Sequence, residues 1–259
     1  MIKYIIIILL LSASAWAGST VYSGSTYIND TYIDNTGSNA TVNMSTKNIL
    51  KTFGYSAFGY YKKTIIAFTN LDDSLIFGEQ ITDSSVISLY RYGSYGTNTD
   101  SVYVAGKVCK NVITSQCTYN IFKTGSDWDS VGCLTAGGTN CDDCWNSLSG
   151  SGIDYVETKG RETYIPNTNA WYRFEIPACH IDSFLAYPDS VNAIILAGQG
   201  FHVNSSQHFY STEYIGTTYD PQLVIYWTEI AGYPAGVGHY PEGVGVGHAP
   251  DGQTVGHKP

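Results

Sequence analysis

The residues whose type and spacing point most directly to chemistry are the six cysteines: Cys109, Cys117, Cys133, Cys141, Cys144 and Cys179. A pair such as Cys141-Asp-Asp-Cys144 also occurs in thiol redox sites and zinc sites. A redox site needs a strand–helix–strand context, and zinc needs a second pair of suitably spaced ligands. Because the pattern offers neither, we interpret all six as structural disulfides, with Cys109 facing Cys117 across a hairpin. The other four would form two further bridges, and the connectivity stays open.

Paired carboxylates are the second feature with chemical potential. Loops rich in aspartate and backbone carbonyls provide the oxygen ligands that Ca²⁺ prefers. A calcium site in the cysteine-rich loop is therefore one interpretation, and a solvated acidic loop is the other. The residues concerned are Asp72, Asp73, Asp127, Asp129, Asp142 and Asp143.

Catalytic motifs are missing from the sequence. It contains no Gly-x-Ser-x-Gly, no His-Glu-x-x-His and no phosphate-binding loop. His180, His202 and His208 are scattered, which is typical of surface or hydrogen-bonded histidines. We therefore predict that the protein is not an enzyme and needs no cofactor.

Tyrosine is unusually abundant, with 22 copies. Tyr90, Tyr92, Tyr95 and Tyr103 alternate along neighbouring predicted strands. A flat ring covers the apolar face of a sugar, so these residues predict a glycan-binding surface. Sheet core and cross-strand pairing explain the same pattern equally well.

Four Asn-x-Ser/Thr sequences are candidate glycosylation sites: Asn29, Asn39, Asn43 and Asn204. In an exported chain such asparagines carry glycans only if they lie on the surface. Chance matches are common in a chain rich in Ser, Thr and Asn.

The N-terminus explains why export is expected. Lys3 precedes an apolar run, and Ala15-Trp16-Ala17 has the pattern of a cleavage site. The run is too short to cross a bilayer, which takes about 20 residues. We predict a signal peptide over residues 1–17 and a secreted or cell-surface protein; a retained N-terminal anchor is the alternative.

The composition fits a secreted all-β protein. The 259 residues carry a net charge of −9, with 43% hydrophobic and 14% charged residues. That is too apolar for a disordered chain and too acidic for a protein that tracks nucleic-acid phosphates.

Short strands separated by turn residues run through most of the chain, and the credible helix is about Ala178–Ala186, after Pro177. The absence of strand–helix alternation predicts a jelly-roll β-sandwich with disulfide-stapled loops, one short helix and extended ends. Further strands are predicted at Thr41–Thr46, Thr64–Thr69, Val86–Tyr92, Ser101–Val108, Trp171–Ile176, Ala193–Ala197, His208–Tyr214 and Gln222–Thr228.

Two segments flank the predicted domain at 30–228. Residues 18–29 are a β-prone extension, and residues 229–259 are a Gly/Pro-rich tail with His239, His248 and His257 spaced nine apart. Such a tail cannot build a core. We expect both segments to assemble copies of the chain, through small apolar or aromatic residues on an extended backbone: Val21, Tyr22, Tyr27, Ile28, Val237, Val244, Val246 and Val255.

Three short motifs stand out: Asp30-Thr-Tyr-Ile33, Phe209-Tyr-Ser-Thr-Glu213 and Pro221-Gln-Leu-Val-Ile-Tyr226. Together they resemble the DNRLRE-type (disaggregatase-related) jelly-roll module of secreted bacterial and archaeal surface proteins. The first motif matches the opening strand of that module, and the other two, its closing signature, are the most specific part. The family's six-letter signature is missing, and so is its second Trp near Cys133. The resemblance implies a non-catalytic jelly roll related to carbohydrate-binding modules of alginate lyases.

Three functions are open to a chain with these features. The flanking segments favour a structural subunit of a surface fibre or matrix, polymerised head to tail by strand complementation. A carbohydrate-binding module that docks a polysaccharide is the alternative, and an enzyme is the least favoured. No membrane span and no nucleic-acid partner are expected.

Overall fold

The computed structural model describes residues 17–55, 60–71, 79–81, 84–95, 100–128, 155–156, 163–166, 169–199, 206–229, 247–248 and 254–255. Within these ranges the protein is almost entirely β-structure with one short α-helix, so the predicted all-β sandwich is confirmed. The strands of the sandwich are β1 (Ala17–Ser23), β2 (Ile28–Asp34), β3 (Ile49–Tyr55), β4 (Tyr60–Phe68), β5 (Glu79–Ile81), β6 (Ser84–Tyr95), β7 (Asp100–Val108), β10 (Tyr155–Val156), β11 (Thr163–Ile165), β12 (Trp171–Pro177), β13 (Ala193–Gln199), β14 (Ser206–Tyr210) and β15 (Gln222–Glu229).

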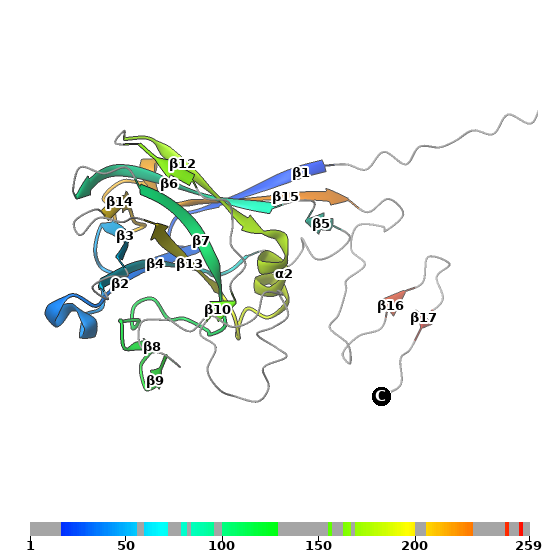
Figure 1. Ribbon diagram of the computed structural model, residues 1–259. Helices are drawn as coiled ribbons and strands as arrows, with labels where there is room; N and C mark the ends of the chain where they lie inside the picture. The colour runs from blue at the N-terminus through cyan, green and yellow to red at the C-terminus, as the bar shows by residue number, and fades with distance from the viewer. Residues whose placement is uncertain are drawn as a thin grey trace, which may run out of the picture.

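These strands form one antiparallel sheet that folds over on itself. Its main path is β1-β15-β6-β14-β3-β4-β13-β7-β10, with β12 beside β6 and β2 beside β4. Figure 1 shows β12, β6, β1 and β15 as one layer above β2, β4 and β13. Strands β14 and β3 connect the layers, because β14 pairs with β6 on one side and with β3 on the other. Two small hairpins, β8–β9 (Ile121–Lys123 and Ser126–Asp127) and β16–β17 (Gly247–His248 and Thr254–Val255), stand apart from this sheet.

Alternating apolar residues build the main core between the two layers. Ile87 and Leu89 of β6 and Phe174 of β12 meet Ile66 of β4 and Leu196 of β13, and all five are fully buried. Neighbouring residues on each strand point the opposite way, as the two-residue period of a strand requires. The side chains on the opposite face of β6 therefore do not belong to this core.

A second core lies on the outer side of the lower layer. Ile65 of β4 and Ile195 of β13 are covered there by Val112, Cys117 and Trp128. The Trp128 indole donates a hydrogen bond to the Thr118 carbonyl at 3.0 Å, which closes this covering segment on itself.

Strand β1 completes the chain's own sheet. Residues 18–23 belong to the predicted N-terminal extension, yet together with Ala17 they form a strand of this sheet. This strand pairs with β15 over seven consecutive positions, from Ala17↔Thr228 to Ser23↔Gln222. Tyr22 and Ile28 lie in the main core, whereas Val21 is exposed. The Trp227 ring occupies the space that a side chain at position 18 would need, since a Cβ there would lie 2.4 Å from it.

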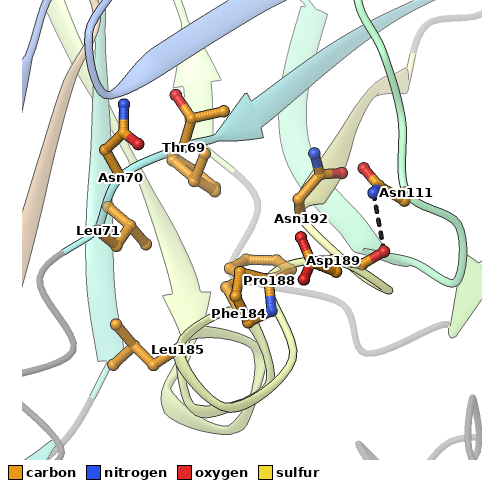
Figure 2. A pocket seen from close by; sticks show the side chains of 10 residues that line it. Thr69, Asn70, Leu71, Asn111, Phe184, Leu185, Pro188, Asp189 and Asn192 are labelled. Carbon is orange, nitrogen blue, oxygen red and sulfur yellow. Dashed lines mark hydrogen bonds between the residues drawn. The ribbon is translucent and has the colours of Figure 1, made fainter.

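The predicted helix is present with the predicted bounds, as α2 (Ala178–Ala186). It is held by Lys107 of β7, whose fully buried ammonium donates to the Ser183 hydroxyl at 2.8 Å. His180 of α2 is also fully buried, which excludes the first of the two positions predicted for it, on the surface or in a hydrogen bond. Burial first, and the Lys107 charge second, lower its pKa to about 3. A cavity lies between α2 and the end of β4 (Figure 2).

Most predicted strands are confirmed, with two differences. Thr41–Thr46 is not a strand: a 3₁₀ turn covers Gly37–Thr41, and turns follow it. The Asn43 amide donates to the carbonyls of Thr114 (2.7 Å) and Cys117 (2.6 Å), which pins this segment to another loop. The strand predicted to reach Tyr214 ends at Tyr210.

The disulfide prediction is wrong for Cys117. Cys109 and Cys179 are disulfide-bonded, but Cys117 is a free thiol in the second core. It behaves there as a small apolar side chain, and burial raises the pKa of its thiol well above the usual range. Cys133, Cys141 and Cys144 lie outside the described residues.

Across the described ranges, none of the helical segments has both the length and the apolar character that crossing a bilayer demands.

The buried position of Cys117 generates a direct prediction. In the native protein its thiol should resist alkylation, because both burial and the raised pKa suppress the reactive thiolate. After unfolding without a reductant, the thiol should react fully, and peptide mapping should place the label on Cys117. Lack of labelling in the unfolded, unreduced chain would show that Cys117 is bridged.

Candidate functional site

The candidate site begins with two tyrosines on the outer face of β6. Tyr90 and Tyr92 are two residues apart, so both side chains lie opposite the face that carries Ile87 and Leu89. Trp171 of β12 is the register partner of Tyr90, and their ring centroids lie 5.6 Å apart in an edge-to-face arrangement. The Trp171 side chain is 38% exposed, which is high for a tryptophan.

Strand β14 and the loop after it extend this cluster. Tyr210 stacks on Tyr92 with centroids 4.7 Å apart, and lies 3.9 Å from Tyr214. Tyr219 sits 4.2 Å from Tyr90 and 5.3 Å from Tyr210. We call the six residues the aromatic face: Tyr90, Tyr92, Trp171, Tyr210, Tyr214 and Tyr219.

The loop that carries Tyr214 and Tyr219 is held by hydrogen bonds at its start. The Ser211 hydroxyl donates to the Lys47 carbonyl at 2.6 Å, and the Tyr214 amide donates to the Ser211 carbonyl at 3.1 Å. A 3₁₀ turn over Thr217–Tyr219 then returns the chain to β15. The two loop tyrosines are therefore positioned by the backbone as well as by ring contacts.

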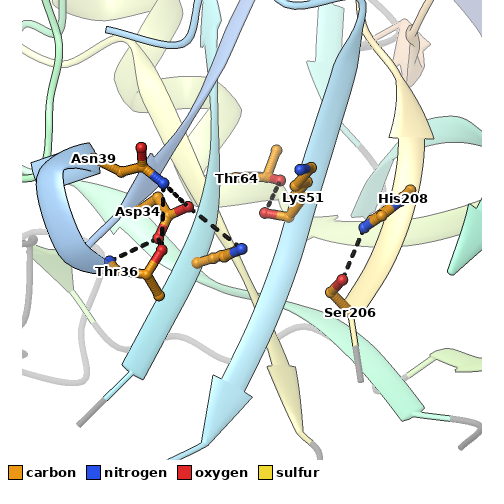
Figure 3. Close-up of polar contacts among 8 residues, drawn as sticks. Asp34, Thr36, Asn39, Lys51, Thr64, Ser206 and His208 are labelled. Atoms are coloured by element: carbon orange, nitrogen blue, oxygen red, sulfur yellow. Dashed lines mark hydrogen bonds and ion pairs between the residues drawn. The ribbon is translucent and has the colours of Figure 1, made fainter. Parts of the chain in front are cut away.

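A basic rim, which we define as Lys51, Lys62 and His208, adjoins the aromatic face at Tyr92. Figure 3 shows Lys51 and His208 on neighbouring strands. His208 of β14 links the two, since its ring lies 5.9 Å from that of Tyr92 and its register partner on β3 is Lys51. The Lys51 ammonium lies 5.6 Å from the centroid of the Tyr32 ring.

Asp34 organises the far end of the rim. Its carboxylate forms an ion pair with Lys62 at 3.4 Å. The same carboxylate accepts hydrogen bonds from the Thr36 amide (2.8 Å), the Thr36 hydroxyl (2.6 Å) and the Asn39 amide (3.0 Å), as Figure 3 shows. These bonds hold the carboxylate inside the protein, where its charge compensates that of Lys62.

The rim's charge resides on its lysines rather than on His208. Burial first, then the charges of Lys51, Lys62 and Arg91, lower the pKa of His208 to about 4. Its ring is therefore neutral at physiological pH, and its Nε2 lies 2.8 Å from the Ser206 hydroxyl. The pKa of Lys51 is lowered, first by partial burial and then by Lys62.

The chemistry that the aromatic face offers is stacking and hydrogen bonding. The pKa of Tyr210 is raised, first by burial and then by its hydrogen bond to Tyr214, so the phenol stays protonated at neutral pH. Protonated phenols both donate and accept hydrogen bonds, and their rings present flat apolar surfaces. This combination suits a ligand with hydroxyl groups around an apolar face.

The sequence located this surface only in part. Tyr90 and Tyr92 belong to it, but Tyr103 lies on β7 and packs against the second core. The side chain of Tyr95 lies outside the described residues. Trp171, Tyr210, Tyr214 and Tyr219 were not predicted; Tyr210 and Tyr214 are spaced by four residues in a stretch expected to be a strand, which concealed their shared surface.

Three of the four candidate glycosylation sites can be placed. The Asn29 amide donates to the Thr69 hydroxyl at 3.1 Å, and the Asn39 amide binds Asp34. Asn43 uses both amide hydrogens on backbone carbonyls, so a glycan on its nitrogen would remove at least one of those bonds. Asn204 lies outside the described ranges.

No cluster of carboxylates that could bind calcium occurs among the described residues. Within those ranges, no three His, Cys, Asp or Glu side chains gather as a metal site. Asp127 is exposed on β9, while Asp72, Asp73, Asp129, Asp142 and Asp143 fall in parts that the structure does not describe.

The tail valines predicted to take part in assembly are mostly outside the described residues. This holds for Val237, Val244 and Val246, whereas Val255 lies in β17.

A buried carboxyl group near the aromatic loop was not foreseen. Asp30 of β2 accepts a hydrogen bond from the Thr212 amide at 2.9 Å, while its Oδ1 has no hydrogen-bond partner. Burial, opposed by Thr212 and reinforced by the charges of Glu213 and Asp220, raises the pKa of Asp30 to about 7.

No protein-family model matches this chain, and neither does any curated protein sequence. The DNRLRE-type resemblance therefore stays a prediction, and function has to be argued from the geometry alone.

Asp30 predicts an unusual pH dependence of stability. A carboxyl whose pKa is about 7 when folded and 3.8 when unfolded binds its proton more tightly in the folded state. The free energy of unfolding should therefore fall as pH rises from about 4 to 7, by up to roughly 4 kcal/mol from this group. Asp30→Asn should flatten that slope in denaturation curves measured at each pH.

Glu213→Gln is the matched variant for this test. Glu213 is exposed and its negative charge raises the pKa of Asp30, whereas Asp220 is a buried carboxyl with a raised pKa of its own. The midpoint of the slope should then move to lower pH. An unchanged slope in Asp30→Asn would show that Asp30 titrates normally.

Proposed function

We propose that this protein is a non-catalytic, secreted β-sandwich that binds polysaccharide through its aromatic face. The observation that carries the proposal is the grouping of six aromatic rings on one surface. Ring-to-ring distances of 3.9 to 6.2 Å join them into one platform. Trp171 is exposed and the five tyrosines are partly exposed, and aromatic clusters that reach the surface mark interaction sites in soluble proteins.

The platform lies across neighbouring strands. Trp171 lies on β12, Tyr90 on β6 and Tyr210 on β14, and neighbouring strands are about 4.8 Å apart. An extended sugar chain that crosses the strands can therefore meet one ring after another. The half-buried rings are pre-arranged by mutual packing, so little side-chain entropy is lost on binding.

The basic rim adds a preference for acidic polysaccharides. Lys51 brings positive charge to the edge of the aromatic face in a chain whose net charge is −9, while the charge of Lys62 is paired with Asp34. Carboxylate or sulfate groups on a bound glycan would be attracted there, and salt would screen that attraction.

The test is co-precipitation or affinity electrophoresis with insoluble and acidic polysaccharides. Tyr210→Ala removes the ring that contacts Tyr90, Tyr92, Tyr214 and Tyr219, and should weaken binding by about 10-fold or more, equivalent to about 1.4 kcal/mol. Trp171→Ala tests the β12 edge of the aromatic face. It carries less risk to folding, because Trp171 is 38% exposed.

Tyr164→Ala is the control. Tyr164 is a 60% exposed tyrosine on β11, and its ring contacts none of the six rings of the aromatic face. Its loss should leave binding unchanged. If Tyr210→Ala and Trp171→Ala bind every polysaccharide as wild type does, the aromatic face is not the binding surface.

Assembly into a fibre is a second candidate function, which strand β1 favours. Trp227 covers Gly18 and donates a hydrogen bond to the Thr20 hydroxyl at 3.2 Å, while Tyr22 enters the core. The expected cleavage after Ala17 would leave β1 at the start of the mature chain. The same strand from a second copy would make identical contacts with β15, and head-to-tail exchange extends into a filament when the rotation between copies does not close a ring.

This candidate predicts linear polymers of the mature chain, seen by electron microscopy and light scattering. Deletion of residues 18–23 should dissolve them, and Gly18→Val should do the same because its side chain would collide with Trp227. Val21→Ser, at a 58% exposed position, should leave them intact. A mature chain that stays monomeric at high concentration would eliminate the fibre.

A further inference from the structure

We propose that the cavity between the end of β4 and α2 binds a single uncharged sugar residue, at a site separate from the aromatic face. The cavity measures about 550 Å³, which lies within the range of small-molecule sites. Figure 2 shows Thr69, Asn70 and Leu71 along one side and Asn111, Asp189 and Asn192 along the other.

The floor of the cavity is apolar. Phe68 at the end of β4 and Phe184 of α2 are in ring contact, with centroids 5.4 Å apart. Leu71, Leu185 and Pro188 continue this surface. Phe68 and Phe184 are each 3% exposed, so only the margins of their rings face the cavity. The C–H groups on one face of a pyranose ring would contact these margins together with Leu71.

The opposite wall is rigid because its amides are already engaged. Asn192 accepts a hydrogen bond from the Val112 amide at 3.0 Å and donates to the Val112 carbonyl at 3.1 Å. The Asn111 amide donates to the Asp189 carbonyl at 2.8 Å, drawn as the dashed line in Figure 2. These bonds fix the wall before any ligand arrives.

Two side chains at the edge of the cavity still have oxygen atoms free to accept hydrogen bonds. Asp189 is exposed, and its carboxylate has no hydrogen-bond or ion-pair partner among the described residues. Asn70 donates to the Thr26 carbonyl at 3.0 Å, which leaves its side-chain oxygen as an acceptor. Its φ of 52° is the left-handed conformation, which no other described non-glycine residue adopts.

The lining chemistry selects an uncharged ligand. Asp189 carries the single formal charge among the described lining residues, which contain no Lys, Arg or His. An anionic ligand would be repelled by this carboxylate. Sugar hydroxyls would instead donate to Asp189 and Asn70. A bound sugar would therefore contact both the polar edge of the cavity and its apolar floor.

The cavity and the basic rim lie at opposite ends of β4. Phe68 lines the cavity and Lys62 belongs to the rim. Six residues of extended strand place them roughly 20 Å apart. One molecule would thus hold an end or branch of a glycan in the cavity, independently of a chain on the aromatic face.

The test is an NMR titration of the ¹⁵N-labelled mature chain with methyl β-glucoside, methyl β-galactoside and glucuronate. At least one neutral glycoside should shift the amide signals of Asn70, Leu71 and Asn192, with a Kd of about 1–10 mM. Glucuronate should bind more weakly. Asp189→Ala should raise the Kd by about 10-fold, as expected for loss of a charge-assisted hydrogen bond.

Two variants separate this site from the proposed function. Glu175→Ala, at an exposed carboxylate on β12, should leave the titration unchanged, and so should Tyr210→Ala. Four results would each overturn the cavity site. The shifts could be abolished by Tyr210→Ala or be unaffected by Asp189→Ala. Glucuronate could bind with equal affinity, or neither neutral glycoside could produce a shift. Loss of the shifts in Tyr210→Ala would place the glycoside on the aromatic face, whereas the other three results leave polysaccharide binding by that face untouched.

Discussion

The pairing of β6 with three other strands is the constraint on which the rest of this structure depends. Along one edge it pairs with β12, and along the other it pairs first with β15 and then with β14. Since β14 also pairs with β3, β6 is where the upper layer turns into the lower one. A break in β6 would separate the two layers and expose both sides of the main core.

The same strand determines where the aromatic face lies. Its inward residues Ile87 and Leu89 must be buried to hold the layers together, so its outward residues are fixed in position as well. Tyr90 and Tyr92 inherit that rigidity. Arg91, between them, points inward and donates from its Nε to Gln207 on β14 at 2.7 Å, which ties the two strands that carry the tyrosines.

Buried polar groups mark the places where this sandwich departs from a simple apolar core. Lys107 anchors α2, and Asp30 sits below the loop that carries Tyr214. Burying a charged group costs free energy unless it is bonded or neutralised. Lys107 is hydrogen-bonded, and Asp30 is half-neutralised near pH 7, so its region becomes more stable as the carboxyl takes up a proton.

The sequence by itself determined the fold class, most strand positions and the bounds of α2, because local alternation and turn residues specify such elements. It also placed Tyr90 and Tyr92 on one face. Only the tertiary structure decided that Tyr210, Tyr214 and Tyr219 join them, since these residues come together through strand pairing more than a hundred positions away. It likewise decided that Cys117 is free, because a cysteine's partner depends on distance in space, which spacing in the chain does not reveal.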